Sequence, residues 1–591
     1  MEKQVKLFNR NEERMESWLW IELIGFDQTA ADFNVDALLH EMSYKPDGMG
    51  LFLYTTDFIN QHNGLEREEL LQPESCSYAA HPYNVDRKRQ AWSNWQLRQL
   101  VAELHKRQIK VYVSVMGYSR LFSDTSPFQE GELLKESPEI RFVSRDGQNL
   151  HITNVLKRFK DGTYYEDFFT RKLIGVLQDY DFDGIQVADG LSSPVRHLEN
   201  GDYSDDMVEQ FVAETKVELP SEWLRGCDDH PEAFEQRGRW IWRNKRKEWV
   251  MFHVQRWNGF YKKLTSAVHG IGREILFNNA LTMEPVEALY RYGLDYRAAV
   301  EAGADGYIVE EVSAALSITS DNGTIFNPAT ELEERMKVRY HCSAVAMNLK
   351  AYNPDLKYLY MTNVWDTTEQ FDIVHHAPTM FQRYIYTNLN LYYQGMNGLE
   401  RCCNGPWFCL SDGLKRQDWD FIHQAWDTGF AANIRTILGA TVIWSDQKLY
   451  PELDYYMGTR RWTSNRIMGE LTYAGAQLNH IARIESLDVI SGAIFVPNFH
   501  LLPRQELEQI LAYRGGKRDP VRPEDRRFAS SRYGGRRRKR RRQRRIVGGL
   551  RKRQAKGEAC FLQSVRAPRR QAGSDGAGKE RVAASIGKRK L

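Results

Sequence analysis

Residues 182–190 read Phe-Asp-Gly-Ile-Gln-Val-Ala-Asp-Gly, a short apolar strand that ends in a carboxylate and a glycine. Residues 304–311 repeat the design as Ala-Asp-Gly-Tyr-Ile-Val-Glu-Glu. In a parallel α/β sheet the carboxyl ends of the strands meet at one edge, where ligands bind. The two segments therefore predict two carboxylates on the same side of one sheet.

Apolar runs alternate with helical patterns on both sides of these segments. Between residues 92 and 106, for example, leucines at 97, 100 and 104 follow the helical period, and an apolar run comes directly after them. Eight strands are predicted in this way, at 18–27, 50–57, 109–116, 182–189, 274–279, 306–310, 358–363 and 389–393. Eight such units favour a closed (β/α)8 barrel over an open doubly wound sheet.

The chain of 591 residues is too long for a single domain. We predict a (β/α)8 catalytic barrel over residues 15–425 and a partial α/β domain over 426–515. A basic, disordered tail is predicted for 516–591. No Gly-x-Gly-x-x-Gly follows the first strand and no phosphate-binding Gly-x-x-x-x-Gly-Lys occurs, so nucleotide binding lacks its usual cradle.

Charge divides the chain into two parts. From Lys517 to Leu591 there are 27 Lys/Arg against 6 Asp/Glu, which leaves 54 against 72 in the remainder. Phosphate contacts need a basic surface, so the acidic body argues against nucleic acid as the partner of the folded part. The basic run could be a nucleic-acid arm or a localisation signal. Its abrupt start within a domain is more typical of a disordered tail, and an altered reading frame would produce it.

Seven cysteines are scattered without a Cys-x-x-Cys pair or a zinc spacing, so we predict reduced thiols and no metal. Neither an apolar leader nor a run near the ~18 apolar residues of a membrane span is present. These features predict a cytoplasmic protein with no membrane partner and no cofactor. A homo-oligomer held by the shortened second domain is compatible with the sequence.

The segment 182–189 resembles the fourth strand of glycoside hydrolase barrels, where an Asp-Gly-Ile-x-Leu-Asp-Asp pattern is common. Residues 427–515 resemble the opening of the glutamine-amidotransferase-like domain that follows the barrel in family 42 β-galactosidases. The resemblance covers roughly residues 15–515, although the motifs for the two catalytic glutamates of family 42 are not recognisable. It implies a carbohydrate substrate and glycosidase activity.

Cleavage of a glycosidic bond needs one protonated acid and one carboxylate. Asp189 and Glu310 are the predicted catalytic pair, and Asp366, after the seventh strand, is the main rival to Asp189. Side chains alternate along a strand, so Glu310 belongs on the inner face while Ala188, rather than Asp189, takes the matching place on the fourth strand. Asp189 could therefore be a substrate ligand or a helix cap instead.

Other polar or aromatic residues at strand ends are predicted to bind the sugar. Carboxylates and amides can hydrogen-bond hydroxyl groups, and an aromatic ring can stack on a pyranose. These predicted substrate-binding residues are Asp27, Asp57, Tyr118, Asn278, Asn279, Glu311, Asn363 and Trp365. Asp27 and Asp57 could instead be turn formers or N-caps, Glu311 a salt-bridge partner and Trp365 a core residue.

The favoured function is a two-carboxylate glycoside hydrolase acting on an oligosaccharide or glycoside. Ala188 at the expected acid position suggests a second possibility, a carbohydrate-binding barrel without catalysis. A nucleic-acid-binding protein with a basic tail is the third hypothesis, and the acidic body disfavours it.

Overall fold

The computed structural model describes ten stretches of the chain: residues 15–77, 88–123, 126–279, 284–310, 332–366, 371–376, 378–411, 413–431, 434 and 437–515. The predicted tail at 516–591 and the candidate Glu311 lie outside these stretches. For Trp365 and Asp366 only the backbone is described.

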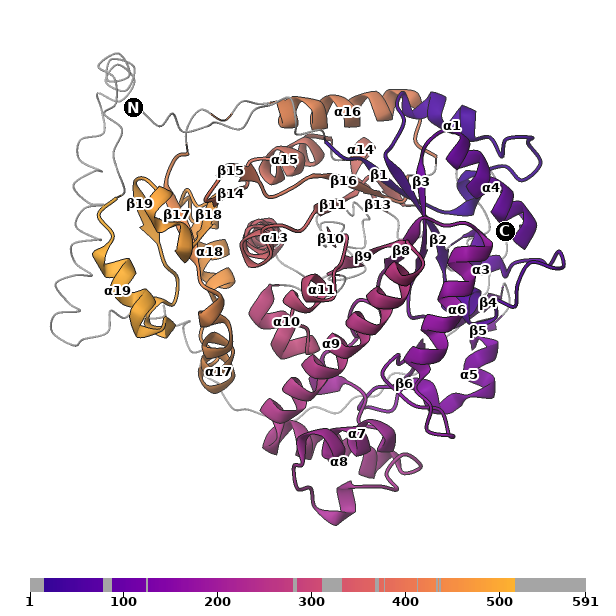
Figure 1. The fold of residues 1–591 in the computed structure, drawn as a ribbon, viewed down its shortest axis with the longest axis horizontal. Coiled ribbons are helices and arrows are strands. Elements are labelled where there is room, and N and C mark those ends of the chain that lie inside the picture. Colours follow the sequence, from indigo (N-terminus) through magenta and orange to yellow (C-terminus); the bar gives the residue numbers. More distant parts are fainter. Residues whose placement is uncertain are drawn as a thin grey trace, which may run out of the picture. The chain divides into compact units, whose positions relative to one another are not determined.

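Eight parallel strands close into a barrel in chain order (Figure 1). This confirms the predicted α/β barrel fold, and seven of the strands lie where the sequence predicts them. The strands are β1 (Trp18–Ile21), β2 (Gly48–Tyr54), β3 (Lys110–Val115), β8 (Gly184–Val187), β9 (Glu274–Asn278), β10 (Gly306–Val309), β11 (Tyr358–Asn363) and β16 (Gly405–Cys409).

The prediction for the eighth strand was wrong. The apolar run at 389–393 contributes to β14 (Tyr392–Gly395), which pairs with β15 (Gly398–Arg401) and with β18 (His480–Arg483) in a separate sheet. Strand β16 closes the barrel between β1 and β11 instead. Both runs are apolar and buried, and periodicity alone cannot tell which sheet a buried strand will join.

Large aromatic side chains fill the barrel interior because glycines on neighbouring strands leave room for them. Trp18, Tyr112 and Trp407 are all fully buried there. A Cβ atom on Gly50 would lie only 2.8 Å from the Trp407 ring. Interiors are packed as densely as organic crystals, so each large ring requires a small partner residue. The barrel is therefore a solid core that leaves only its mouth for a ligand.

Helices cover the outside of the barrel (Figure 1). The predicted helix over 92–106 is α4, which begins with a Ser93–Gln96 capping box and buries leucines 97, 100 and 104 against the barrel. The main covering helices are α1 (Val35–Met42), α4 (Asn94–Lys106), α6 (Tyr165–Asp179), α9 (Arg246–Gly270), α11 (Arg297–Glu301), α13 (Leu332–Tyr352), α15 (Pro378–Asn388) and α16 (Arg416–Ala431).

Further elements lie in the loops that follow the barrel strands. They are α2 (Asp57–Asn60), α3 (Pro73–Cys76), β4 (Arg120–Ser123), β5 (Ser126–Glu130), α5 (Glu132–Glu136), β6 (Arg141–Val143), β7 (Asn149–Thr153), α7 (Asp205–Thr215), α8 (Pro231–Asn244), α10 (Pro285–Tyr292), β12 (Trp365–Asp366), β13 (Phe371–Asp372) and α14 (Ile373–His376). The connection from β3 to α6, residues 116–164, is called the β3 loop below.

A second, five-stranded sheet has the order β15-β14-β18-β17-β19. Strands β17 (Ala440–Trp444) and β19 (Ala493–Phe495) are parallel to β18, and helices α17 (Leu449–Thr459), α18 (Ser464–Tyr473) and α19 (Arg504–Ala512) accompany them. Because β14 and β15 precede β16 in the chain, the barrel and the second sheet are interleaved in sequence. The domain boundaries at 425 and 515 stay predictions.

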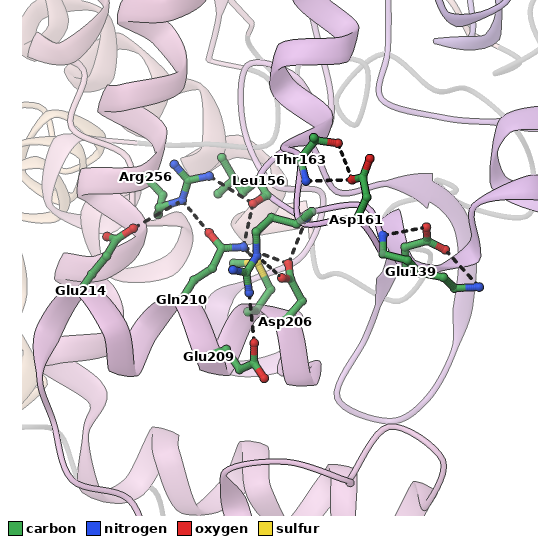
Figure 2. Close-up of polar contacts among 12 residues, drawn as sticks. Glu139, Leu156, Asp161, Thr163, Asp206, Glu209, Gln210, Glu214 and Arg256 are labelled. Atoms are coloured by element: carbon green, nitrogen blue, oxygen red, sulfur yellow. Dashed lines mark hydrogen bonds and ion pairs between the residues drawn. The ribbon is translucent and has the colours of Figure 1, made fainter.

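A network of polar contacts holds the far end of the β3 loop, and we call it the distal anchor (Figure 2). The Arg256 guanidinium donates to Gln210, to the Leu156 carbonyl and to Glu166, at 3.0, 3.1 and 3.1 Å. Arg158 pairs with Asp206 at 2.6 Å and with Glu209 at 3.2 Å. The loop is thereby fixed to α6, α7 and α9.

The six described cysteines are free thiols. Burial raises the pKa of Cys403 to about 12 and that of Cys402 as well, so both are neutral at physiological pH. In the ten described stretches, no group of three or more His, Cys, Asp or Glu residues could hold a metal ion. None of the helices described there is both long and apolar enough to cross a membrane.

Candidate active site at the barrel mouth

The alternation of side chains decides which residues at the strand ends face the barrel interior. Leu276 and Ile308 belong to the interior cluster, whereas Phe277 and Val309 pack among the residues under the helices. Two residues after Leu276 and Ile308 come Asn278 and Glu310. By this alternation, Asn278 and Glu310 belong to the inward-facing side of their strands at the mouth of the barrel.

On β8 the inward place belongs to Ala188, as the sequence predicts. Gln186 faces inward, where it accepts a hydrogen bond from Ser114, and Ile185 and Val187 face the helices. Ala188 is fully buried. Asp189 follows it at the point where the strand leaves the barrel.

Asp189 lies in a sharp turn against the β3 loop. Its carbonyl accepts the Gly117 N–H at 2.5 Å, and the next residue, Gly190, has φ +81°. A Cβ on Gly117 would lie 2.8 Å from the Gly190 Cα, so this close approach requires glycine. Burial raises the pKa of Tyr292 to about 12, and the Asp189 charge adds to the rise. The Asp189 carboxylate thus interacts electrostatically with α10.

Strand order brings Asp189, Asn279 and Glu310 to three consecutive strand ends. Strands β8, β9 and β10 are neighbours, with Val187 opposite Phe277 and Asn278 opposite Ile308. The Asn279 side-chain carbonyl accepts the Glu310 N–H at 2.5 Å. Asn278 and Asn279 are both buried. This part of the rim therefore groups both predicted catalytic acids with two of the predicted sugar ligands.

The seventh strand contributes Asn363, which is buried and inward by alternation from Leu359 and Met361. After it, the backbone of Asp366 pairs with Phe371 in the two-stranded sheet formed by β12 and β13. The roles predicted for Asp366 and Trp365 depend on their side chains and stay predictions.

Asp27 and Asp57 have structural contacts instead of open positions in the mouth. The Asp27 carboxylate accepts hydrogen bonds from the Thr29 N–H and hydroxyl at 2.9 and 2.7 Å, which is the geometry of a turn former. Asp57 has no exposed surface and accepts a hydrogen bond from Ser119 at 2.6 Å. In this conformation Asp57 cannot touch a sugar directly.

Tyr118 lies beside two residues that the sequence analysis did not single out. Its ring stacks on Tyr54 with centroids 5.8 Å apart, and the Arg120 guanidinium lies 4.2 Å above the Tyr118 ring. Tyr54 follows a β-bulge at the end of β2 and has φ +65°. Tyr54 faces the barrel interior by the same alternation as Phe52, whereas Leu51 and Leu53 face the helices.

Glu22 is a further acid that sequence reasoning missed. Trp18 and Trp20 face the barrel interior, and Leu19 and Ile21 face the helices, so Glu22 has the inward alternation at the end of β1. It is 4% exposed. The alternating Trp-x-Trp-x-Glu pattern is the available signal, but the apolar run continues from Leu23 to Phe26 and hides the end of the strand.

No protein-family model and no curated protein sequence matches this chain. Among solved structures, it is similar to the PgaB (BpsB) glycoside hydrolase domain from Bordetella bronchiseptica, with 12% identity over 72% of this chain and 100% of that chain, at a TM-score of 0.39. It is also similar to a GH5_18 protein from Bifidobacterium longum subsp. infantis, with 9% identity over 82% and 97% of the two chains, at a TM-score of 0.39.

The catalytic domain of a beta-amylase from Paenibacillus polymyxa is a third such structure, with 10% identity over 70% of this chain and 99% of that chain, at a TM-score of 0.36. Likenesses this remote carry no functional argument. The finer resemblance to family 42 and to an amidotransferase-like domain stays a prediction.

Proposed function

We propose that this chain is a cytoplasmic glycoside hydrolase that uses Asp189 and Glu310 as its two carboxylates. The observation that supports this most strongly is the position of Glu310, an inward acid at the mouth of a closed barrel. Its backbone N–H is held by Asn279, on the strand that separates it from Asp189. Barrel enzymes place their catalytic residues at these strand ends.

The chemistry assigns one acid to the leaving oxygen and the other to attack or to activation of water. Carboxyl groups about 5–5.5 Å apart give retention, and groups about 6.5–9.5 Å apart give inversion. Both Asn278 and Asn363 have inward alternation, and an amide can donate to and accept from sugar hydroxyls. An oligosaccharide or glycoside is the substrate class that matches this set of groups.

Two other acids are substitutes for Asp189 in this scheme. Asp366 follows β11, the strand next to β10 in the barrel. Glu22 has the same inward alternation on β1 that Glu310 has on β10. Either could supply the second carboxylate if Asp189 only binds the substrate.

A panel of chromogenic glycosides tests the assignment with Asp189→Asn, Glu310→Gln, Asp366→Asn and Glu22→Gln. Loss of one catalytic carboxylate is expected to lower kcat by at least about 100-fold. The exposed residues Glu508 and Asp488 provide matched controls, because Glu508→Gln and Asp488→Asn make the same chemical changes in the region of the second sheet. Turnover that survives in both Asp189→Asn and Glu310→Gln would rule out the proposed pair.

A non-catalytic carbohydrate-binding barrel is the second candidate, and Ala188 favours it. The inward position of β8 carries a buried methyl group in place of an acid. If this candidate is right, calorimetry will detect oligosaccharide binding that depends on Asn278 and Asn363, whereas no glycoside in the panel is turned over.

A further inference from the structure

Asp57 has an environment that is unusual for a carboxyl group. It begins α2 directly after the end of β2, and none of its surface is exposed. Oδ2 accepts a hydrogen bond from the Ser119 hydroxyl at 2.6 Å, whereas Oδ1 is buried with no hydrogen-bond partner among the described residues. An ionised carboxylate in such a place costs far more free energy than a neutral one.

The contacts of Asp57 lead directly to the start of the β3 loop. Gly131 packs so closely that a Cβ atom there would overlap both Asp57 Oδ2 and Ser119 Oγ. The Gly131 N–H donates to the Ser119 carbonyl at 3.1 Å, and the Ser119 N–H donates to the His151 carbonyl at 2.9 Å. We call the group formed by Asp57, Ser119 and Gly131 the proximal anchor.

The proximal anchor adjoins the aromatic group at the barrel mouth. Thr56 donates to the Tyr118 carbonyl from both its N–H and its hydroxyl, at 2.9 and 3.1 Å. Tyr118 is next to Ser119 in the chain and contacts Tyr54 and Arg120. A change at Asp57 therefore reaches a predicted sugar-binding residue through one hydrogen bond and one peptide unit.

The charged and titratable groups around Asp57 come from several elements. Glu74 on α3 and Glu132 on α5 disfavour a second negative charge, and Lys135 on α5 opposes them. Tyr165, at the start of α6, is fully buried, and a charge on Asp57 raises its pKa. Together, these neighbouring charges do not offset the free-energy cost of a negative charge on the buried Asp57.

We propose that Asp57 is a positioning residue that holds the start of the β3 loop at the barrel mouth and loosens it when its carboxyl group loses a proton. Burial raises the pKa of Asp57 to about 6, against the Ser119 hydrogen bond, so the change falls near physiological pH. The inference deepens the proposed function, because the loop carries Tyr118. It would make ligand binding at the mouth stronger below about pH 6 than above it.

Amide hydrogen exchange of residues 116–123 in the full chain, without any sugar, tests this inference. After correction for the intrinsic pH dependence, protection in the wild type is expected to fall by about tenfold between about pH 5 and about pH 7.5. Asp57→Asn, which is isosteric and cannot ionise, is expected to show no such fall. A wild type without the pH effect, or an Asn variant that retains it, would overturn the proposal.

Two further variants keep the test decisive. Asp183→Asn changes a carboxyl group at the opposite end of the barrel, where it accepts hydrogen bonds from His105 and from the Val111 N–H, and should leave the loop response intact. Ser119→Ala removes the hydroxyl donor to Asp57 and should lower protection at both pH values; unchanged protection would count against the proposal. Since no sugar is present, a failure of the proposed glycosidase activity leaves this readout unaffected.

Discussion

The two anchors of the β3 loop hold it by different physical means. At the distal anchor, the buried Arg256 guanidinium forms an ion pair with the Glu166 carboxylate and donates a hydrogen bond to the Gln210 side chain. At the proximal anchor, the buried Asp57 has one hydroxyl donor and, among the residues that the structure describes, no cation in hydrogen-bonding contact. The proximal anchor changes its charge near neutrality, because the pKa of Asp57 is raised to about 6. A buried network in which every charge has an opposite charge and hydrogen-bond partners stabilises the fold. A buried charge that lacks such partners is a place where function can be controlled.

Disruption of the distal anchor should cause the largest change in the free energy of unfolding. Arg256→Ala leaves Gln210 and the buried Glu166 without their guanidinium partner, although Lys263 still contacts Glu166 at 2.6 Å. Removing one member of a buried ion pair typically costs about 3–5 kcal/mol. Urea unfolding at neutral pH measures this loss. Arg504→Ala, at an exposed pair with Glu508, is the matched control and should change stability by less than about 0.5 kcal/mol.

Asp57→Asn should have the next largest effect on the free energy of unfolding. At neutral pH this variant should be more stable than the wild type. The pKa of Asp57 is raised to about 6, so the wild-type fold binds its proton more tightly than the unfolded chain does. The contribution of Asp57 to stability is therefore fully present below about pH 4 and is lost as the pH rises through about 6, by up to about 3 kcal/mol. Unfolding curves of the Asn variant should lack this decline. A parallel decline in both proteins would assign the pH dependence to other groups.

Asp183, at the other end of the barrel, has a pKa that is lowered in the folded protein, whereas that of Asp57 is raised. Burial alone would raise its pKa, but hydrogen bonds from His105 and from the Val111 N–H outweigh burial and hold the pKa below its usual value. Its contribution is present above the unfolded pKa and is lost as the pH falls through the folded pKa. Asp183→Asn should cost about 1.5 kcal/mol at neutral pH and progressively less in acid, as measured by unfolding. An equal cost at all pH values would contradict this.

The smallest effect is expected for Glu209→Gln at the edge of the distal anchor. Glu209 pairs with Arg158 at 3.2 Å, but its side chain is 35% exposed and Asp206 also holds the same guanidinium. Exposed pairs contribute about 0–1 kcal/mol, and salt screens them. We expect a loss below about 0.5 kcal/mol that disappears in high salt. A loss near that of Arg256→Ala would show that the network acts as one unit.

Sequence patterns predicted the barrel well because its signals are local. An apolar run with a turn at each end fixes a strand, and the leucines of α4 fix a helix. Alternation also predicted that Ala188 and Glu310 occupy matching inward places, which the interior cluster supports. The alternation at β1 also identifies Glu22 once the strand is known to end at Ile21.

The rest of the site depends on contacts between distant segments. Asp57 meets Ser119 across 62 positions, and no spacing rule connects them. Tyr54 and Tyr118, whose rings stack, also lie on separate segments of the chain, and no local pattern connects them. The same limit explains the wrong eighth strand, because both β14 and β16 are short buried runs.

The hairpin of β14 and β15 limits where the chain can be truncated to give an isolated barrel. It lies between α15 and β16, so every fragment that contains a complete barrel also contains β14. In the whole protein β14 pairs with β18, more than 80 residues later in the chain. A fragment ended near residue 425 would expose that edge, and an unpaired edge strand invites association with other chains. The shortest soluble barrel fragment should therefore extend through the end of α19.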